Sequence, residues 1–155
     1  MEEIVKECIQ ESIRIKEKIL NTCVPEIIVS AKLIIEALRK GKKILICGNG
    51  GSAADSQHFV AELIVRFEKN RVALPAIALT TNSSNLTACS NDFSFKEIFS
   101  RQVNALGSEG DVFLGISTSG NSSNVLLAFE HAKKQKMLTI GLSGNEGGEL
   151  KKTKA

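Results

Sequence analysis

The sequence contains no tryptophan and no tyrosine, and phenylalanine is its only aromatic residue, with seven copies. Because stacking of bases on aromatic side chains is thus limited, a surface for single-stranded nucleic acid is not expected. The net charge is only +3, and acidic and basic residues are interspersed, so no strong field toward nucleic acid or a membrane surface is expected. No apolar run approaches the roughly 18–20 residues that cross a bilayer.

The sequence also lacks paired cysteines. Cys8, Cys23, Cys47 and Cys89 are widely spaced and form no CxxC motif. The first residues are acidic and do not resemble a signal peptide. These features predict reduced, mostly buried thiols in a cytoplasmic protein.

Two nucleotide-binding signatures are incomplete or missing. Residues 48–53 fit the pattern GxGxxA, but the acidic residue expected at the end of the next strand is replaced by Thr80, Thr81 and Asn82. A nicotinamide-dependent enzyme is therefore disfavoured. The absence of a GK[ST] triplet excludes a P-loop.

The composition predicts one globular domain over residues 1–155, because 43% of the 155 residues are hydrophobic and 24% are charged. Apolar residues at helical spacing predict a helix over 4–20 and a second helix from Pro25 to a stop at Gly41, capped by Asn21 or Thr22. We expect residues 1–41 to form a helical hairpin. It could pack on the rest of the chain or on another subunit, and the pattern leaves both open.

Short β-branched runs alternate with helical patterns over residues 42–155. The expected strands are 43–47, 75–79, 111–115 and 137–142, and the expected helices are 53–67, 83–88, 95–106 and 125–136. This alternation predicts an α/β fold, namely a three-layer, doubly wound parallel sheet with helices on both faces.

A turn rich in hydroxyl groups follows the expected strand at 111–115. Residues 115–124 read GISTSGNSSN, and a helix is expected to begin at Ser122 or Ser123. Backbone amides, hydroxyls and a helix N-terminus would then surround one small volume, which favours binding of a phosphate. The alternative is an ordinary helix cap. A cap needs only one hydroxyl, so the number of hydroxyls favours the anion site.

Residues 44–52, 112–122 and 138–147 form a weak internal repeat of strand, polar glycine-rich turn and helix. Parallel strands end at the same edge of the sheet, so we expect the three turns to converge there, where doubly wound folds bind ligands.

Asp55, His58, Glu62 and Arg66 follow the first turn at spacings of three and four, so they share one helix face. His58 and Glu62 could bind a metal together or act as acid and base. The alternative, to which we give equal weight, is that this helix face is simply exposed to solvent and that Glu62 and Arg66 form an ion pair on it. Asn91-Asp92 predicts a turn or a helix cap, and a sugar contact at this position has no support from spacing alone.

Together these segments resemble the SIS (sugar isomerase) domain family, in particular its phosphoheptose isomerase branch, over essentially the whole chain. The matching segments are residues 48–55, 58–62, 91–93, 99–103 and 110–122. The resemblance implies an aldose–ketose isomerase that converts sedoheptulose 7-phosphate to D-glycero-D-manno-heptose 7-phosphate through an enediol. This reaction supplies heptose for bacterial surface polysaccharide, including lipopolysaccharide.

The resemblance also implies roles for individual residues. The implied phosphate ligands are Ser117, Thr118, Ser119 and Ser122. The implied sugar contacts are Asn49, Gly50, Gly51, Asn91 and Asp92, and Glu62 is the implied catalytic base, which also contacts the substrate. His58 and Glu62 match two zinc ligands of the family.

Family members form homotetramers, whose leading helices build a central bundle and whose active sites lie between subunits. Their chains continue with a strand and a helix that carry a Gln and a His, the remaining zinc ligands. The present sequence supplies neither and ends at Ala155, so it is expected to be incomplete at the C-terminus relative to the family. Two alternatives remain: the chain is shortened from a longer protein, or it is a natural truncation. The competing function is a non-catalytic SIS module that binds a sugar phosphate or docks on a protein.

Overall fold

The computed structural model describes residues 1–153, and the chain divides into two compact units, Met1–Leu33 and the part from Ile34 onward. Helix α1 (Glu2–Thr22) and helix α2 (Val24–Arg39) are separated only by Cys23. The division therefore falls inside α2 rather than at residue 41. The predicted cap at Asn21 or Thr22 is wrong, because both residues belong to the last turn of α1.

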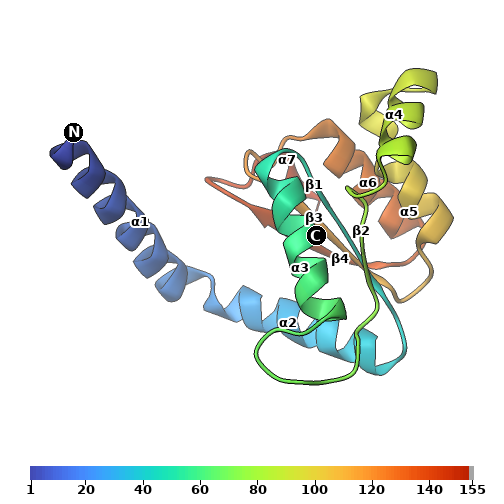
Figure 1. The fold of residues 1–155 in the computed structure, drawn as a ribbon, viewed down its shortest axis with the longest axis horizontal. Helices are drawn as coiled ribbons and strands as arrows, with labels where there is room; N and C mark the ends of the chain where they lie inside the picture. Colours follow the sequence, from blue (N-terminus) through green and yellow to red (C-terminus); the bar gives the residue numbers. More distant parts are fainter. Residues whose placement is uncertain (154–155) are drawn as a thin grey trace. The chain divides into compact units, whose positions relative to one another are not determined.

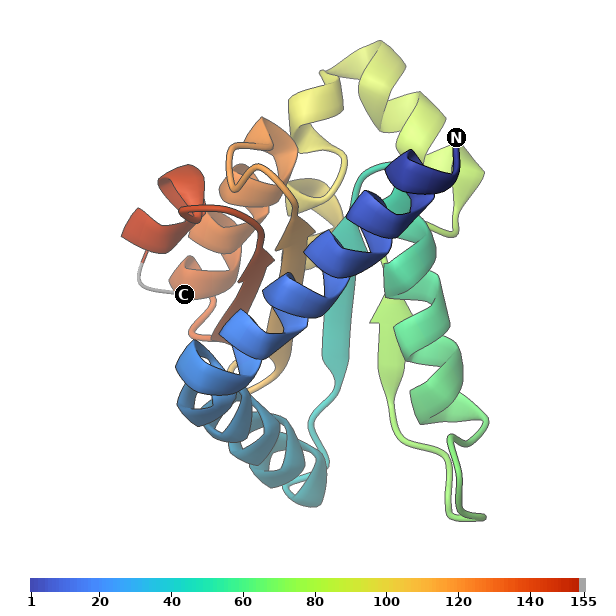
Figure 2. The same ribbon diagram turned by 90° about the vertical axis from the view of Figure 1, so that its left-hand side faces the viewer.

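The second unit is built on one sheet of four parallel strands (Figure 2). The strands are β1 (Ile44–Gly48), β2 (Ala76–Ala78), β3 (Val112–Ser117) and β4 (Leu138–Ser143), and their order in the sheet is β2-β1-β3-β4. β1 pairs with β3 from Ile44↔Val112 to Gly48↔Ile116. The predicted doubly wound parallel sheet is confirmed.

Helices cover both faces of this sheet (Figure 1). One face packs against α3 (Gly51–Ile64) and the end of α2, and its core includes Ile44, Ile46 and Val60. The opposite face packs against α4 (Ser83–Asp92), α5 (Ser100–Leu106), α6 (Ser123–Lys134) and α7 (Gly148–Lys152). Adjacent residues of β1 point to opposite faces, so an almost continuous apolar strand serves both cores.

Two predicted helices differ from the observed ones by more than three residues. The expected helix over 95–106 is split into a 3-10 turn, η1 (Phe95–Glu97), and α5, because Ile98 and Phe99 turn into the core and are both 2% exposed. The helix expected over 83–88 extends to Asp92. Asn82 caps it by accepting a hydrogen bond from the Asn85 amide at 3.0 Å.

Within residues 1–153, none of the helices combines the length and the apolar character needed to cross a membrane.

Candidate functional site

The carboxyl ends of β1 and β3 form a topological switch point. From β1 the chain enters α3, on one face of the sheet, whereas from β3 it enters α6, on the other. The two connections diverge and leave a crevice between them, which is where open α/β sheets bind ligands. The loop after β1 carries Asn49, Gly50 and Gly51, and the loop after β3 carries the predicted phosphate ligands.

The loop over residues 118–122, which we call the serine loop, supplies no side-chain cap to the first turn of α6, where the side chain of Asn124 accepts from the Val125 amide at 2.9 Å. Ser122 is the N-cap residue, but its side chain accepts no hydrogen bond from an α6 amide. Its Oγ instead accepts a hydrogen bond from Ser117 Oγ at 2.9 Å. The ordinary N-cap by Ser122 that was predicted as the alternative is therefore not formed. Asn124 satisfies the Val125 amide, so the amides of Ser123 and Asn124 are the ones suited to an anion.

The serine loop is shaped by Gly120 and by the turn after β4. Gly120 has φ of +69°, in the left-handed region, and its amide donates to the Ser117 carbonyl. Behind it, the Gly144 amide donates to Thr118 O, and the Leu150 amide donates to Gly120 O. Thus the third glycine-rich turn buttresses the serine loop through its backbone, whereas Thr118 and Ser119 remain exposed.

Asn49 joins the first turn to the serine loop's helix. Its side-chain amide exchanges two hydrogen bonds with Asn124, both 2.9 Å long. Gly50 has φ of +56°, and no atom lies within 4 Å of the Cβ position of Gly50 or Gly51. This open backbone lets a ligand approach α3, whose N-terminus also has no side-chain cap. Asn124 was not singled out from the sequence, since nothing local reveals a partner 75 residues away.

His58 and Glu62 lie on the exposed side of α3. Their Nε2 and Oε1 atoms are 3.0 Å apart, so Glu62 is paired with His58. None of the ion pairs found in residues 1–153 joins Glu62 to Arg66, so the predicted Glu62–Arg66 stripe is not formed. The pair borders a cleft of about 440 Å³ that Phe59, Phe67 and Arg71 also line.

Arg71 holds the end of α3 and was missed in the sequence. Its guanidinium donates to the carbonyls of Glu62 at 2.6 Å and Leu63 at 2.8 Å. These carbonyls belong to the last turn of the helix and have no partner within it. Arg71 therefore fixes the backbone that carries Glu62.

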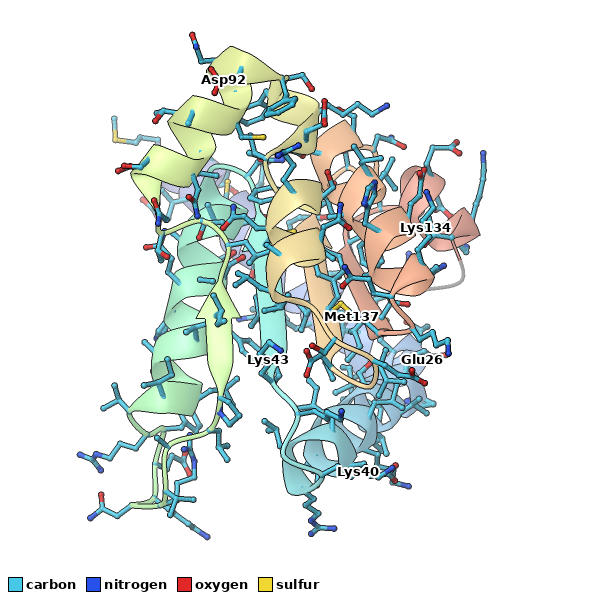
Figure 3. All side chains as sticks on the ribbon, turned by 90° about the vertical axis from the view of Figure 1, so that its right-hand side faces the viewer. Glu26, Lys40, Lys43, Asp92, Lys134 and Met137 are labelled. Atoms are coloured by element: carbon cyan, nitrogen blue, oxygen red, sulfur yellow. The ribbon has the colours of Figure 1, made fainter. Side chains whose placement is uncertain are left out.

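Asn91 and Asp92 lie in the last turn of α4 rather than in the predicted turn or cap. Asn91 Nδ2 donates to Asp92 Oδ1 at 2.9 Å. Figure 3 shows Asp92 at the top of the view, above the carboxyl ends of the strands. Nearby, Arg101 lies over the Phe93 ring, 3.9 Å from its centre.

The structure brings only some of the predicted site residues together. Asn49 and the serine loop meet through Asn124, but Glu62 comes eleven residues after Gly51, roughly 16 Å further along α3. No hydrogen bond or ion pair within residues 1–153 joins the serine loop, the His58–Glu62 pair and the Asn91–Asp92 pair to one another. Within the described chain the site therefore consists of three separate groups.

Zinc sites in proteins use nitrogen, sulfur and carboxylate oxygen donors, almost always at least three of them. His58 and Glu62 fit as two such donors. Within residues 1–153, however, no group of three or more His, Cys, Asp and Glu side chains could hold a metal. The described residues thus supply part of a zinc site and do not complete it.

Comparisons with known proteins agree on one family. The SIS domain model matches residues 7–144. The phosphoheptose isomerase of Clostridium acetobutylicum is 53% identical over 153 residues, which cover 97% of this chain and 78% of that protein. That of Campylobacter jejuni is 60% identical over 123 residues, covering 79% of this chain and 66% of its own length.

Solved structures give the same result. The phosphoheptose isomerase of Neisseria gonorrhoeae superposes with a TM-score of 0.92 at 46% identity, covering 97% of this chain and 79% of that one. The one from Francisella tularensis gives a TM-score of 0.94 at 41% identity, with coverage of 97% and 78%.

The sheet topology, the ligand crevice and these matches place the chain in the SIS domain family. The relatives that share about half of its residues are phosphoheptose isomerases, which identifies the branch of the family. Within the family, the chain belongs to the phosphoheptose isomerases, as the resemblance predicted.

Proposed function

We propose that the chain interconverts sedoheptulose 7-phosphate and D-glycero-D-manno-heptose 7-phosphate, and so supplies heptose for bacterial surface polysaccharide. Membership of the phosphoheptose isomerases supports this reaction. The observation that carries it is the N-terminus of α6, which Ser122 does not cap, beneath a loop of hydroxyl groups at the switch point. This is a binding site for the phosphate of a small polar substrate.

In this proposal the substrate phosphate binds to Ser117, Thr118, Ser119 and Ser122 and to the first amides of α6. The residues of the serine loop and Ser117 carry no charge. Binding therefore relies on hydrogen bonds and on the helix dipole, which favours a negative group at its N-terminus.

Glu62 is proposed as the base for the isomerisation. It removes a proton from C1 of the ketose, the electron pair forms the C1=C2 bond, and the C2 oxygen takes up a proton to give the enediol. The O1 proton then leaves as C1 becomes the aldehyde, and C2 receives a proton. Substrate and product are isomers, so no oxidant or reductant is consumed. Asn49, Gly50, Gly51, Asn91 and Asp92 are the proposed sugar contacts.

We propose His58 and Glu62 as two ligands of a zinc ion. Bound zinc would polarise the sugar oxygens that carry charge during the reaction. Residues 1–153 do not complete this site.

A second copy of the chain is the proposed partner, and a homotetramer in the cytoplasm is the proposed assembly. In one chain the Glu62 side chain is 36% exposed and His58 is 77% exposed. An enediol phosphate must be shielded from water to avoid side reactions. A neighbouring subunit over this face of α3 would supply that shielding.

Replacing Glu62 by Gln tests the proposal, because it removes the base and keeps the size of the side chain. A coupled isomerase assay on the chain, with and without added zinc, should show turnover lowered by about a thousandfold or more, within the range attributed to general bases. Calorimetry should show sugar-phosphate binding preserved. Glu130→Gln is the matched control, because Glu130 is exposed on α6 and outside the site. Unchanged turnover in Glu62→Gln would rule out Glu62 as the base.

A non-catalytic sugar-phosphate module is the second candidate function. The three separate groups of site residues and the incomplete metal site favour it. The same assay distinguishes the two functions: binding of sedoheptulose 7-phosphate without turnover by the unmodified chain, with zinc present, would favour the binding module.

A further inference from the structure

Asn49 and Asn124 form a closed pair of side-chain amides across the switch point. Asn49 Nδ2 donates to Asn124 Oδ1, and Asn124 Nδ2 donates to Asn49 Oδ1, each at 2.9 Å. Turning either amide over would place like atoms against each other, so the two orientations depend on one another. Asn124 is only 2% exposed.

The backbone of α6 determines the orientation of this pair. The amide of Val125 donates to Asn124 Oδ1 at 2.9 Å, so that oxygen is fixed toward the helix. Asn49 must then present its Nδ2 to the same oxygen. Because a side-chain amide has two donor hydrogens and two acceptor lone pairs, the exchange uses one of each on Asn49. One hydrogen and one lone pair of Asn49 remain for a ligand.

The pair also fixes the spacing between two parts of the site. Asn124 comes two residues after Ser122, at the end of the serine loop, and Asn49 directly follows β1. The strands are already in register up to Gly48 and Ile116. The amide pair continues this connection beyond the sheet, between the loop with the proposed sugar contacts and the loop with the proposed phosphate ligands.

We infer that Asn124 is a positioning residue for the isomerase: it orients the free donor and acceptor of Asn49 toward the sugar and holds them at a set distance from the phosphate. This inference rests on the proposed function. Both members are neutral, so the connection adds no negative charge beside the phosphate. An aspartate at position 124 would keep its acceptors but lose the donor to Asn49 Oδ1.

A double-mutant cycle tests the inference through binding. Calorimetry on the full chain gives Kd for inorganic phosphate and for sedoheptulose 7-phosphate. The Kd for phosphate divided by the Kd for the sugar phosphate measures the contribution of the sugar to binding. Asn49→Ala and Asn124→Ala should each lower this ratio by about tenfold, as expected for a lost hydrogen bond to a positioned group. The double variant should lose little more than either single variant, because Asn124 acts through Asn49. Affinity for phosphate alone should change less than threefold.

Two further variants keep the test independent of folding. Asn124→Asp retains the acceptor for the Val125 amide but loses the donor to Asn49 Oδ1. Its negative charge weakens the binding of phosphate and of the sugar phosphate alike, so a change in the ratio still reports the lost donor. Asn104→Ala, an exposed position on α5, is the matched control and should leave the ratio unchanged.

Each outcome has one meaning. If the unmodified chain binds sedoheptulose 7-phosphate no more tightly than phosphate, the proposed function fails, and the inference fails with it. Suppose that the unmodified chain binds the sugar phosphate more tightly than phosphate. The inference alone is then overturned if the reductions of the ratio in Asn49→Ala and Asn124→Ala multiply in the double variant, or if Asn124→Asp retains the full ratio.

Discussion

The two serines Ser117 and Ser122 show how single side chains would prepare the proposed anion site without a cation. Their hydroxyls hydrogen-bond to each other, and the Ser122 amide lies 3.4 Å from Ser117 Oγ. Both hydroxyls are thus held in place before a ligand arrives, while neither of them caps the N-terminus of α6. The conformational entropy of these side chains is lost when the protein folds and is not lost again on binding, which favours ligand affinity.

At the same scale, the buried thiols give a prediction about pH. Burial raises the pKa of the Cys47 thiol above its ordinary value of 9.0. The folded state therefore keeps a proton that the unfolded state releases, so the stabilisation is present below pH 9.0 and is lost as the pH rises above it. Denaturant unfolding at pH 8 and pH 10 should show a loss for Cys47 of up to about 1.4 kcal/mol per pH unit.

Replacing Cys47 by Ala should remove this part of the pH dependence. Cys8→Ala is the matched control, because Cys8 is exposed on α1. An identical pH dependence in the Cys47→Ala variant and the unmodified chain would contradict the assignment.

At the scale of elements, the serine loop depends on the turn after β4. A Cβ added to Gly120 would collide with the Gly147 carbonyl, and φ of +69° is itself unfavourable for other residues. Gly120→Ala should lower the free energy of unfolding by about 2 kcal/mol or more, since strain and collision act together. It should also weaken phosphate binding.

Gly41→Ala provides the comparison, measured by denaturant unfolding and phosphate calorimetry. Gly41 has φ of +72°, but nothing lies within 4 Å of its Cβ position. Strain alone should then cost about 1 kcal/mol, with phosphate affinity unchanged. Equal losses in the two variants would show that the turn after β4 does not support the loop.

The element order could be predicted from the sequence because β-branched runs and helical spacing alternate clearly from Lys42 onward. Boundaries that depend on tertiary contacts could not. Ile98 and Phe99 interrupt the helix expected over 95–106 because the core takes both side chains. Likewise, the serine loop was recognisable from its hydroxyls, whereas Asn124 acquires its role only when the fold brings Asn49 to it. Patterns in one segment carry little information on such distant pairs.

At the scale of the whole molecule, α1 has an apolar stripe and none of its residues is buried. Val5, Ile9 and Ile13 follow one another at intervals of four and are each at least 52% exposed. Exposed apolar surface of this extent is typical of an interface between subunits. It is consistent with the proposed association with further copies of the chain.

Charges placed on this stripe should disrupt the assembly. Light scattering after size-exclusion chromatography should give the mass of an oligomer for the unmodified chain and a lower mass for the double variant Ile9→Glu, Ile13→Glu, because burying two carboxylates at an apolar contact is costly. Arg14→Glu is the matched control, because it changes the net charge by the same amount as the double variant and Arg14 lies on the polar side of α1, with its side chain 76% exposed. The mass of a single chain for the unmodified protein would refute the proposed assembly.

The central claim is that the serine loop binds the phosphate of the sugar substrate. A crystal structure of the chain with sedoheptulose 7-phosphate tests this claim most directly. The predicted result is phosphate density within hydrogen-bonding distance of Ser117, Ser119 and Ser122, at the N-terminus of α6, with the sugar extending toward Asn49. Phosphate density elsewhere, for example in the pocket lined by Asn85, Cys89 and Arg101, with the serine loop empty, would contradict it.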